Sequence, residues 1–474
     1  MWELVTLHAK CCQQVLSNAQ GHASRSTTEG YGVTVPASTL NRTLGYWDLV
    51  IYGLAYIAPM GIFSTLGFVW TESRGLIALA YILGGVCMFF TAKSYAVMTE
   101  SVPTAGSVYG FARHALGVLP GFIAGWMILL DYLLIPSFVY VTIAVAFGSL
   151  VPGLDRAFWI VLLVGFTTAV NWFGVTVTTR ANFVSVVLQV LVLIGFAGLA
   201  TIAMGHGFGN GAMTLRPFYL SGHLEAGAIF SATSLCIMSF LGFDAISTLS
   251  EEVKGHDRRM IGRAIVAVLL ISAAFFILLA WVFGNVLPGI TIQDPAAAYL
   301  DLARAAIGPW AALVLAWAVV IIVGFSNAVP MQVGVARVLF AMGRDRQLPH
   351  VLARVHERYR TPYVGMLASA AISLAIALAM RNLIDELASM VNFGALSGFL
   401  LLHMSVLAKF AINQRSRNWF LHWLVPLAGI AVVLAVFTGM SRLAMEVGIS
   451  WLVLGCVYGL VLKARRRGEL AAGL

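Results

Sequence analysis

The chain has 474 residues, 60% of them hydrophobic and only 10% charged, with a formal net charge of +9 and a mean hydropathy of +0.89. A soluble protein carries about 25% charged residues, so this composition excludes a water-soluble enzyme. Glycine (46 residues) and tryptophan (12 residues) are abundant, as in bundles of membrane helices. The five cysteines and ten histidines show neither metal-ligand nor disulfide spacing. We therefore expect an integral membrane protein with no metal and no cofactor.

Residues 1–42 are polar and mixed, without the short apolar core of a signal peptide, and predict a flexible cytoplasmic tail. From Leu49 onward, long uncharged runs alternate with short charged clusters. A helical span needs about 20 apolar residues, and we predict twelve spans. They lie approximately at 46–70, 75–98, 119–149, 157–175, 181–204, 226–251, 262–287, 309–342, 362–380, 384–411, 419–440 and 443–463. Period-2 alternation is absent, which predicts an all-α transmembrane domain over 43–463 and a cytoplasmic tail over 464–474.

The distribution of Lys and Arg predicts the orientation of the spans. With an inside N-terminus, the outside loops hold six of the 29 basic residues, namely Arg74, Arg156, Arg216, Arg304, Arg381 and Arg442. The other 23 lie inside or at inner span ends, and such an excess fixes orientation. Both termini are therefore predicted to be cytoplasmic, in a cell inner (plasma) membrane. The net positive charge therefore indicates the orientation of the protein in the membrane, to which attraction by anionic lipid headgroups contributes. It does not indicate a nucleic-acid-binding surface.

Two predicted spans contain helix-breaking residues near mid-membrane. The first has Ala58-Pro59-Met60-Gly61, and the sixth has Gly242 within residues 239–244. Proline removes a backbone donor, and glycine tolerates unwound geometry. Discontinuous helices at matching positions of two repeats point to the substrate site of a transporter, where unwound amides favour an anionic group. The alternative is that Gly and Pro are simply common in membrane helices.

Two acids fall well inside the spans, Asp131 in the third and Asp244 in the sixth. A carboxylate in hydrocarbon costs about 2.5 kcal/mol or more, so its default interpretation is functional. The alternative is a structural acid that is hydrogen-bonded to a neighbouring helix or protonated. His403, in the tenth span, is interpreted as a packed, hydrogen-bonded residue rather than a ligand.

The residues around these features resemble the amino acid–polyamine–organocation (APC) superfamily, in the branch of the bacterial putrescine importers. The resemblance runs from Trp47 to about residue 460. Its motifs are GLAYIAPM at 53–60, GW at 125–126, LDYL at 130–133, SFLGFDA at 239–245, TLSEE at 248–252, MGRD at 342–345, TP at 361–362 and NFGA at 392–395. The resemblance implies a LeuT-type fold with inverted repeats (about 46–204 and 226–411), two further helices (about 419–463) and alternating access.

Site residues follow from the arginine–agmatine antiporter of this superfamily. Its first-span Gly-Ser-Gly, which holds the substrate carboxylate, matches Pro59-Met60-Gly61, so the amides near Met60 and Gly61 inherit that role. The sixth-span Trp over its substrate matches Met238, which cannot make the same cation–π contact. Its proton-sensing glutamate matches Asp244, and a substrate-facing third-span position matches Asp131. The predicted substrate-binding residues are Ala58, Pro59, Met60, Gly61, Ser64, Asp131, Met238, Phe240, Gly242 and Phe243, and those for proton coupling are Asp244 and Asp131.

Two departures bear on the substrate and the driving ion. Putrescine importers carry Asp where this chain has Ser64, which weakens the case for a dication. Some proton-coupled permeases carry a fifth-span Lys where this chain has Gln189, so the coupling mechanism of those permeases cannot be assigned to this chain. The eighth span has no clear Ser/Thr pair for a sodium site, which leaves the proton as the favoured ion.

The sequence thus predicts a secondary active transporter, a proton-coupled importer of a small amine, either an amino acid or a polyamine such as putrescine. An exchanger of the same substrates is the alternative. An integral-membrane enzyme is less favoured because no nucleophile–base pair or metal motif appears. A channel is less favoured because it usually needs a repeated pore segment.

Overall fold

A computed structural model describes residues 44–102, 107–173, 179–219, 225–250, 253–254, 259–344, 347–357, 359 and 361–471. Within these residues the structure is helical throughout, and the one β-type pairing is an isolated bridge between Leu44 and Val253. The predicted N-terminal tail and the acids Glu251 and Glu252 lie outside the described residues. The predicted C-terminal tail is largely a continuation of the last helix, which extends to Ala471.

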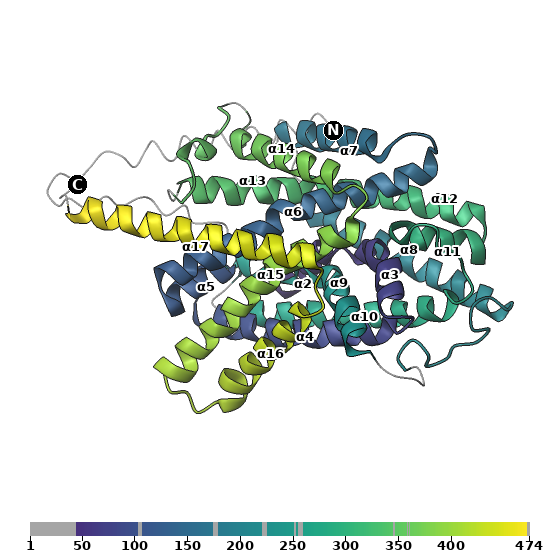
Figure 1. The fold of residues 1–474 in the computed structure, drawn as a ribbon, viewed down its shortest axis with the longest axis horizontal. Helices are drawn as coiled ribbons and strands as arrows, with labels where there is room; N and C mark the ends of the chain where they lie inside the picture. The colour runs from purple at the N-terminus through teal and green to yellow at the C-terminus, as the bar shows by residue number, and fades with distance from the viewer. Residues whose placement is uncertain are drawn as a thin grey trace. The chain divides into compact units, whose positions relative to one another are not determined.

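The helices follow the predicted spans in chain order (Figure 1). The first half comprises α2 (Tyr46–Ile57), α3 (Ile62–Glu72), α4 (Ile77–Ser101), α5 (Ser107–Leu116), α6 (Val118–Leu150), α7 (Arg156–Trp172) and α8 (Thr179–Gly205). The second half comprises α9 (Ala226–Cys236), α10 (Arg259–Val286), α11 (Ala298–Ala306), α12 (Pro309–Ala318), α13 (Val329–Arg344), α14 (Tyr363–Ala379), α15 (Ile384–Val406), α16 (Val425–Phe437) and α17 (Arg442–Ala471). Three π-helical segments, Val319–Ala328, Leu407–Asn413 and Phe420–Leu424, adjoin α12, α15 and α16.

Ten helical segments of the described chain are long and apolar enough to cross a membrane. Two shorter apolar helices, α7 and α14, coincide with the predicted fourth and ninth spans. Large apolar side chains project outward from α8 (Leu191, Ile194, Ile202) and from α17 (Leu454, Val457, Leu460). Exposed apolar surface of this extent suits contact with lipid rather than water.

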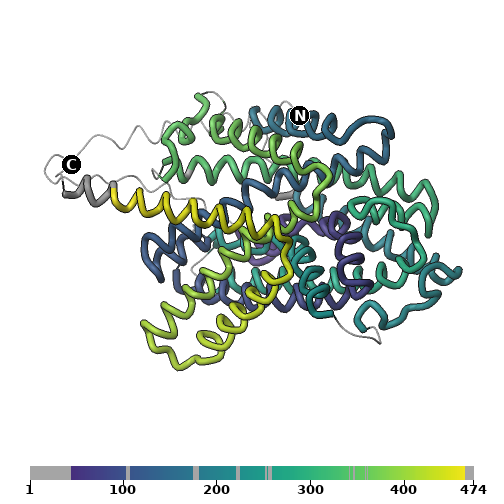
Figure 2. Tube along the Cα trace, viewed as in Figure 1, coloured from purple at the N-terminus to yellow at the C-terminus, as the bar shows by residue number. Residues whose placement is uncertain are grey.

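The first span lies among later helices, because α2 packs against α8 and α10. In Figures 1 and 2 its purple trace is accordingly surrounded by teal and green segments. Small residues permit the closest contacts: a Cβ added at Gly262 of α10 would lie 2.8 Å from the Ala96 Cα of α4. A Cβ at Gly394 of α15 would lie 2.8 Å from the Asp131 amide nitrogen. Packing through small residues is how membrane helices associate, and here it fixes the turn of α6 that carries Asp131.

Two short helices, α5 and α11, are not among the predicted spans. Each follows a long helix, α4 and α10 respectively. The segment before α11 begins with a helix start signal: Asp294 accepts the Ala296 N–H at 3.0 Å, and Pro295 occupies the first helical position. Both helices are too short to span a membrane.

Candidate substrate site

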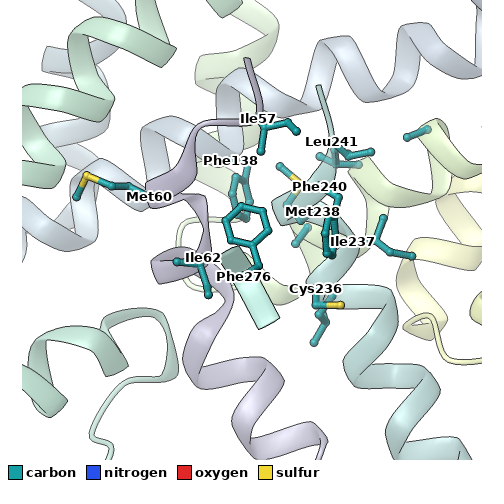
Figure 3. Packing of buried hydrophobic residues seen from close by; sticks show 14 of the residues in the cluster. Ile57, Met60, Ile62, Phe138, Cys236, Ile237, Met238, Phe240, Leu241 and Phe276 are labelled. Carbon is teal, nitrogen blue, oxygen red and sulfur yellow. The ribbon is translucent and has the colours of Figure 1, made fainter. Parts of the chain in front are cut away.

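The first predicted break is present at residues 58–61. Helix α2 ends at Ile57, and Ala58 takes a left-handed conformation with φ +55°. A 3-10 turn over Pro59–Gly61 then leads into α3. Figure 3 shows the chain leaving its helical path between Ile57 and Ile62, opposite the irregular sixth-span segment that carries Met238 and Leu241. A left-handed residue followed by proline ends the helix in the middle of an apolar run.

The sixth span is also broken, and its break touches the first. Helix α9 ends at Cys236 and gives way to a 3-10 turn over Ile237–Phe240. Gly242 has φ +114°, and a Cβ added there would lie 2.8 Å from the Tyr56 carbonyl oxygen. Only glycine satisfies both this backbone angle and this approach. A second 3-10 segment, Phe243–Leu249, continues the chain.

One cavity lies against both breaks, and we call it the break cavity. Five of the predicted residues line it, namely Ala58, Met60, Gly61, Ser64 and Met238. The other lining comes from the first and sixth spans (Tyr56, Ile57, Phe63, Leu241), α6 (Ile135, Phe138, Val139, Thr142), α11 (Tyr299) and the eighth span (Val319, Val323, Asn327, Met331). This lining is mostly apolar, with a few polar groups, as in sites for small organic molecules.

A second, smaller cavity holds the two intramembrane acids, and we call it the acid cavity. Asp131 and Asp244 both line it, together with Tyr132, Gly242 and Tyr56. Tyr95 donates a 3.5 Å hydrogen bond to Asp244 Oδ2. Asp131 Oδ1 is buried and has no hydrogen-bond partner among the described residues. No lysine or arginine lines this cavity in the described structure, so the two carboxylates face it without a protein cation.

The backbone amides at the first break already have partners within the protein. The Met60 N–H donates to Gln189 Oε1 of α8 at 3.1 Å, and the Gly61 N–H donates to the Ala58 carbonyl at 2.7 Å. Gln189 is fully buried, and its amide nitrogen donates to Ser185 Oγ at 3.2 Å. A substrate carboxylate at these amides would therefore have to displace bonds that this conformation makes.

A third cavity adjoins the other two. Its lining includes Asn171, Asn327 and Arg337. Tyr56 and Met331 line all three cavities, so these two residues lie between them. Side chains in such a position can act as a gate only if they move.

Some predicted residues line neither the break cavity nor the acid cavity. Phe240 is fully buried, with its ring centroid 5.4 Å from that of Phe276, and Phe243 packs 6.0 Å from Phe399. Both rings therefore contact neighbouring helices. Pro59 is buried as the first residue of its 3-10 turn.

His403 is a packed, hydrogen-bonded residue, as predicted. Its Nδ1 lies 2.8 Å from Ser94 Oγ and its Nε2 lies 3.4 Å from Thr91 Oγ1. Gly429 leaves room for its ring, because a Cβ there would lie 2.2 Å from His403 Cε1.

Four residues that line the break cavity are not among the predicted site residues, namely Tyr56, Tyr299, Asn327 and Met331. The charged residues of the spans predicted the site, but neutral amides within apolar runs carry the same kind of signal. Asn327 is such a residue, in the apolar run of the eighth span. Tyr299 carries no signal of this kind, since it lies between predicted spans.

Cavities at two broken helices, within a bundle of apolar helices, are typical of an integral membrane protein with a small-molecule site between its helices. The chain belongs to the amino acid permease family, whose model matches residues 44–459. This places it in the APC superfamily and confirms the predicted resemblance. The family and the relatives below are membrane transporters rather than enzymes.

Three relatives span most of the chain. The low-affinity putrescine importer PlaP of Escherichia coli (strain K12) is 33% identical over 426 residues, which are 88% of this chain and 93% of the relative. The branched-chain amino acid permease BcaP of Bacillus subtilis (strain 168) is 29% identical over 411 residues, 81% and 84% of the two chains. A methylthioribose transporter of the same bacterium is 28% identical over 397 residues, 78% and 82% of the two chains.

Proposed function

We propose that this chain is a proton-coupled importer of a small amine, either an amino acid or a polyamine such as putrescine. The observation that supports it most is the acid cavity, where Asp131 and Asp244 meet beside both breaks without a lining cation. Buried carboxylates must be paired with a cation or protonated. In a proton-coupled amine importer, the ammonium group of the substrate and the coupling proton are the partners of the two carboxylates.

The relatives support the same range of substrates. One carries putrescine and another carries branched-chain amino acids, by their names. The methylthioribose transporter shows that a relative can carry a compound that is not an amine. Two facing carboxylates are a poor environment for a neutral ligand, which favours an amine for this chain.

The proposed layout has twelve spans in a cell inner membrane, with the N-terminal tail (1–42) and the C-terminal tail (464–474) both cytoplasmic. We assign spans 1–5 and 6–10 to inverted repeats of LeuT type. Two features support this assignment: both repeats begin with a broken helix, and a short helix follows the second long helix of each, α5 and α11. The contact between α4 and α10 pairs the second span with the seventh.

The proton is assigned to Asp244, with Asp131 as its neighbour. Gln189 occupies the fifth-span position and cannot titrate, so it holds the Met60 N–H as a neutral partner. Asp244 lies two residues after Gly242, in the segment whose position depends on the sixth-span break. Movement of this segment during alternating access would change the exposure of its carboxyl group.

Counterflow in proteoliposomes tests the transporter class. Vesicles preloaded with unlabelled putrescine, spermidine or each standard amino acid should accumulate the same labelled compound faster than empty vesicles, for at least one of them. Equal rates for every compound would contradict an amine carrier. Accumulation by counterflow without any response to a pH gradient would favour the exchanger instead.

Asp244→Asn should uncouple the proton. We expect uptake driven by a pH gradient to fall more than about tenfold, with a smaller loss in substrate exchange, since coupling free energies of this size are usual. Asp244→Glu keeps a titratable carboxyl group and should retain the gradient response. An unchanged pH dependence in Asp244→Asn would assign the proton elsewhere.

A further inference from the structure

Tyr299 reaches the break cavity from outside the spans. It is the second residue of the short helix α11, and its side chain lines the cavity with Gly61, Ser64 and Met238. Tyr299 is 1% exposed. Close approach of this segment to the first span depends on Gly67, where a Cβ would lie 2.6 Å from Ala298 Cβ.

The ring of Tyr299 is held in place by packing. It stacks on Phe63 of α3, with ring centroids 4.7 Å apart and planes inclined by 10°. Phe63 in turn contacts Phe196 of α8 and Phe283 of α10, at centroid distances of 5.7 and 6.3 Å. Stacked aromatic groups restrict each other's orientation, so the direction of the Tyr299 hydroxyl is fixed by three membrane helices.

The segment that carries Tyr299 is also tied down by polar contacts. Asp301 Oδ2 accepts the Gln293 N–H at 2.9 Å, and Asp301 Oδ1 accepts from Arg304 at 3.2 Å. Asp294, just before α11, forms an ion pair with Arg156 at the start of α7. A hydroxyl on this well-supported segment is pre-organised for binding.

The hydroxyl of Tyr299 is buried and has no hydrogen-bond partner within the described structure. Two other hydroxyls at the break cavity differ, because Ser64 donates to the Gly61 carbonyl at 2.6 Å and Thr142 donates to the Phe138 carbonyl at 2.9 Å. Burial of a hydroxyl group is unfavourable unless the group has a hydrogen-bond partner. A substrate in the break cavity would supply such a partner.

We propose that Tyr299 Oη binds the transported substrate and selects for a polar group at the end away from the acid cavity. That polar group is the second ammonium of a diamine or the carboxylate of an amino acid, since a tyrosine hydroxyl both accepts and donates. The inference rests on the proposed function, which supplies the ammonium group at the acid cavity.

Substrates with and without the distal polar group test the inference. Putrescine is paired with butylamine, and leucine with isopentylamine, in competition for labelled uptake by proteoliposomes. Tyr299→Phe should lower the apparent affinity for putrescine or leucine, the members that carry the distal polar group, at least about tenfold. The affinity for butylamine or isopentylamine should stay within about twofold of the wild-type value, because these amines lack the polar group that the Tyr299 hydroxyl would bind.

Thermal stability separates this role from a structural one. Tyr299→Phe removes an unpaired hydroxyl, so the Tm should stay the same or rise. The matched control is Tyr140→Phe in α6, whose hydroxyl lies 2.8 Å from Thr167 Oγ1 and does not line the break cavity. That control should lower the Tm and leave the apparent affinity unchanged.

Each result decides a different point. If wild-type protein transports none of putrescine, spermidine and the standard amino acids, the proposed function and this inference both fall. If it transports one and Tyr299→Phe keeps the wild-type affinity for it, only the role of Tyr299 is refuted. Equal losses for putrescine and butylamine, or a fall in Tm without loss of affinity, would make Tyr299 a packing residue.

Discussion

Gly61→Val should abolish uptake while the protein remains folded and inserted. A Cβ added at Gly61 meets no atom within 4 Å, and this glycine lines the break cavity. Its backbone angles, φ −56° and ψ −26°, are ordinary for any residue. The valine side chain would therefore occupy cavity space instead of straining the fold. We expect transport to fall about 100-fold or more, with the free energy of unfolding changed by no more than about 0.5 kcal/mol.

The matched control for this change is Gly198→Val. Gly198 lies on the outward face of α8, and a Cβ there also meets nothing within 4 Å. The same change in that position should affect neither uptake nor Tm. Gly242 is unsuitable for this comparison, because its φ of +114° and its contact with Tyr56 make any side chain disruptive. Wild-type uptake by inserted Gly61→Val protein would show that substrate does not pass through the break cavity.

The apolar helices and both breaks could be predicted because each is a local property of the chain. Apolar runs define the helices, and Pro59 and Gly242 lie within the irregular segments that interrupt the first and sixth spans. The two acids were also visible, since any carboxylate inside a span stands out from its neighbours. Their meeting in one cavity was expected only through the resemblance to a family.

Features that depend on the direction of a side chain could not be predicted in this way. Phe240 and Phe243 lie on either side of Leu241 and Gly242. The extended backbone of Leu241 interrupts the helical turn, so helical periodicity no longer predicts which way each ring points. The bond between the Met60 N–H and Gln189 joins residues 129 positions apart. The place of Tyr299 in the cavity requires the fold of α11 over α3, which no run of residues encodes by itself.

The bonded amides at the first break change the expectation for the substrate. In the sequence-based prediction, the amides of Met60 and Gly61 hold a substrate carboxylate. In the structure these two N–H groups donate to Gln189 and Ala58. A carboxylate would have to compensate for two lost hydrogen bonds, whereas an ammonium group at the acid cavity displaces none of them. Recognition of the amine end is therefore the stronger part of the proposal.

Asp131→Asn is expected to weaken substrate binding by about 2 kcal/mol or more, roughly 30-fold in affinity. Asp131 Oδ1 is buried without a partner among the described residues, and the carboxylate lines the acid cavity with Asp244. If its partner is the substrate ammonium, asparagine removes the attraction but keeps the shape of the side chain. The Tm of the substrate-free protein should hold or rise, since the change removes the charge of a buried carboxylate that no lysine or arginine lining the cavity balances.

The competing interpretation is that Asp131 makes a polar contact between helices and never meets the substrate. In that case Asp131→Asn should lower the Tm, and the remaining transport should keep its apparent affinity. Asp155→Asn is the matched control: it removes one negative charge at the start of α7, where asparagine caps a helix as well as aspartate does. Tm and affinity measured on all three purified proteins distinguish the two roles. A lower Tm with unchanged affinity for Asp131→Asn would place Asp131 outside the substrate site and remove the main reason to expect an amine.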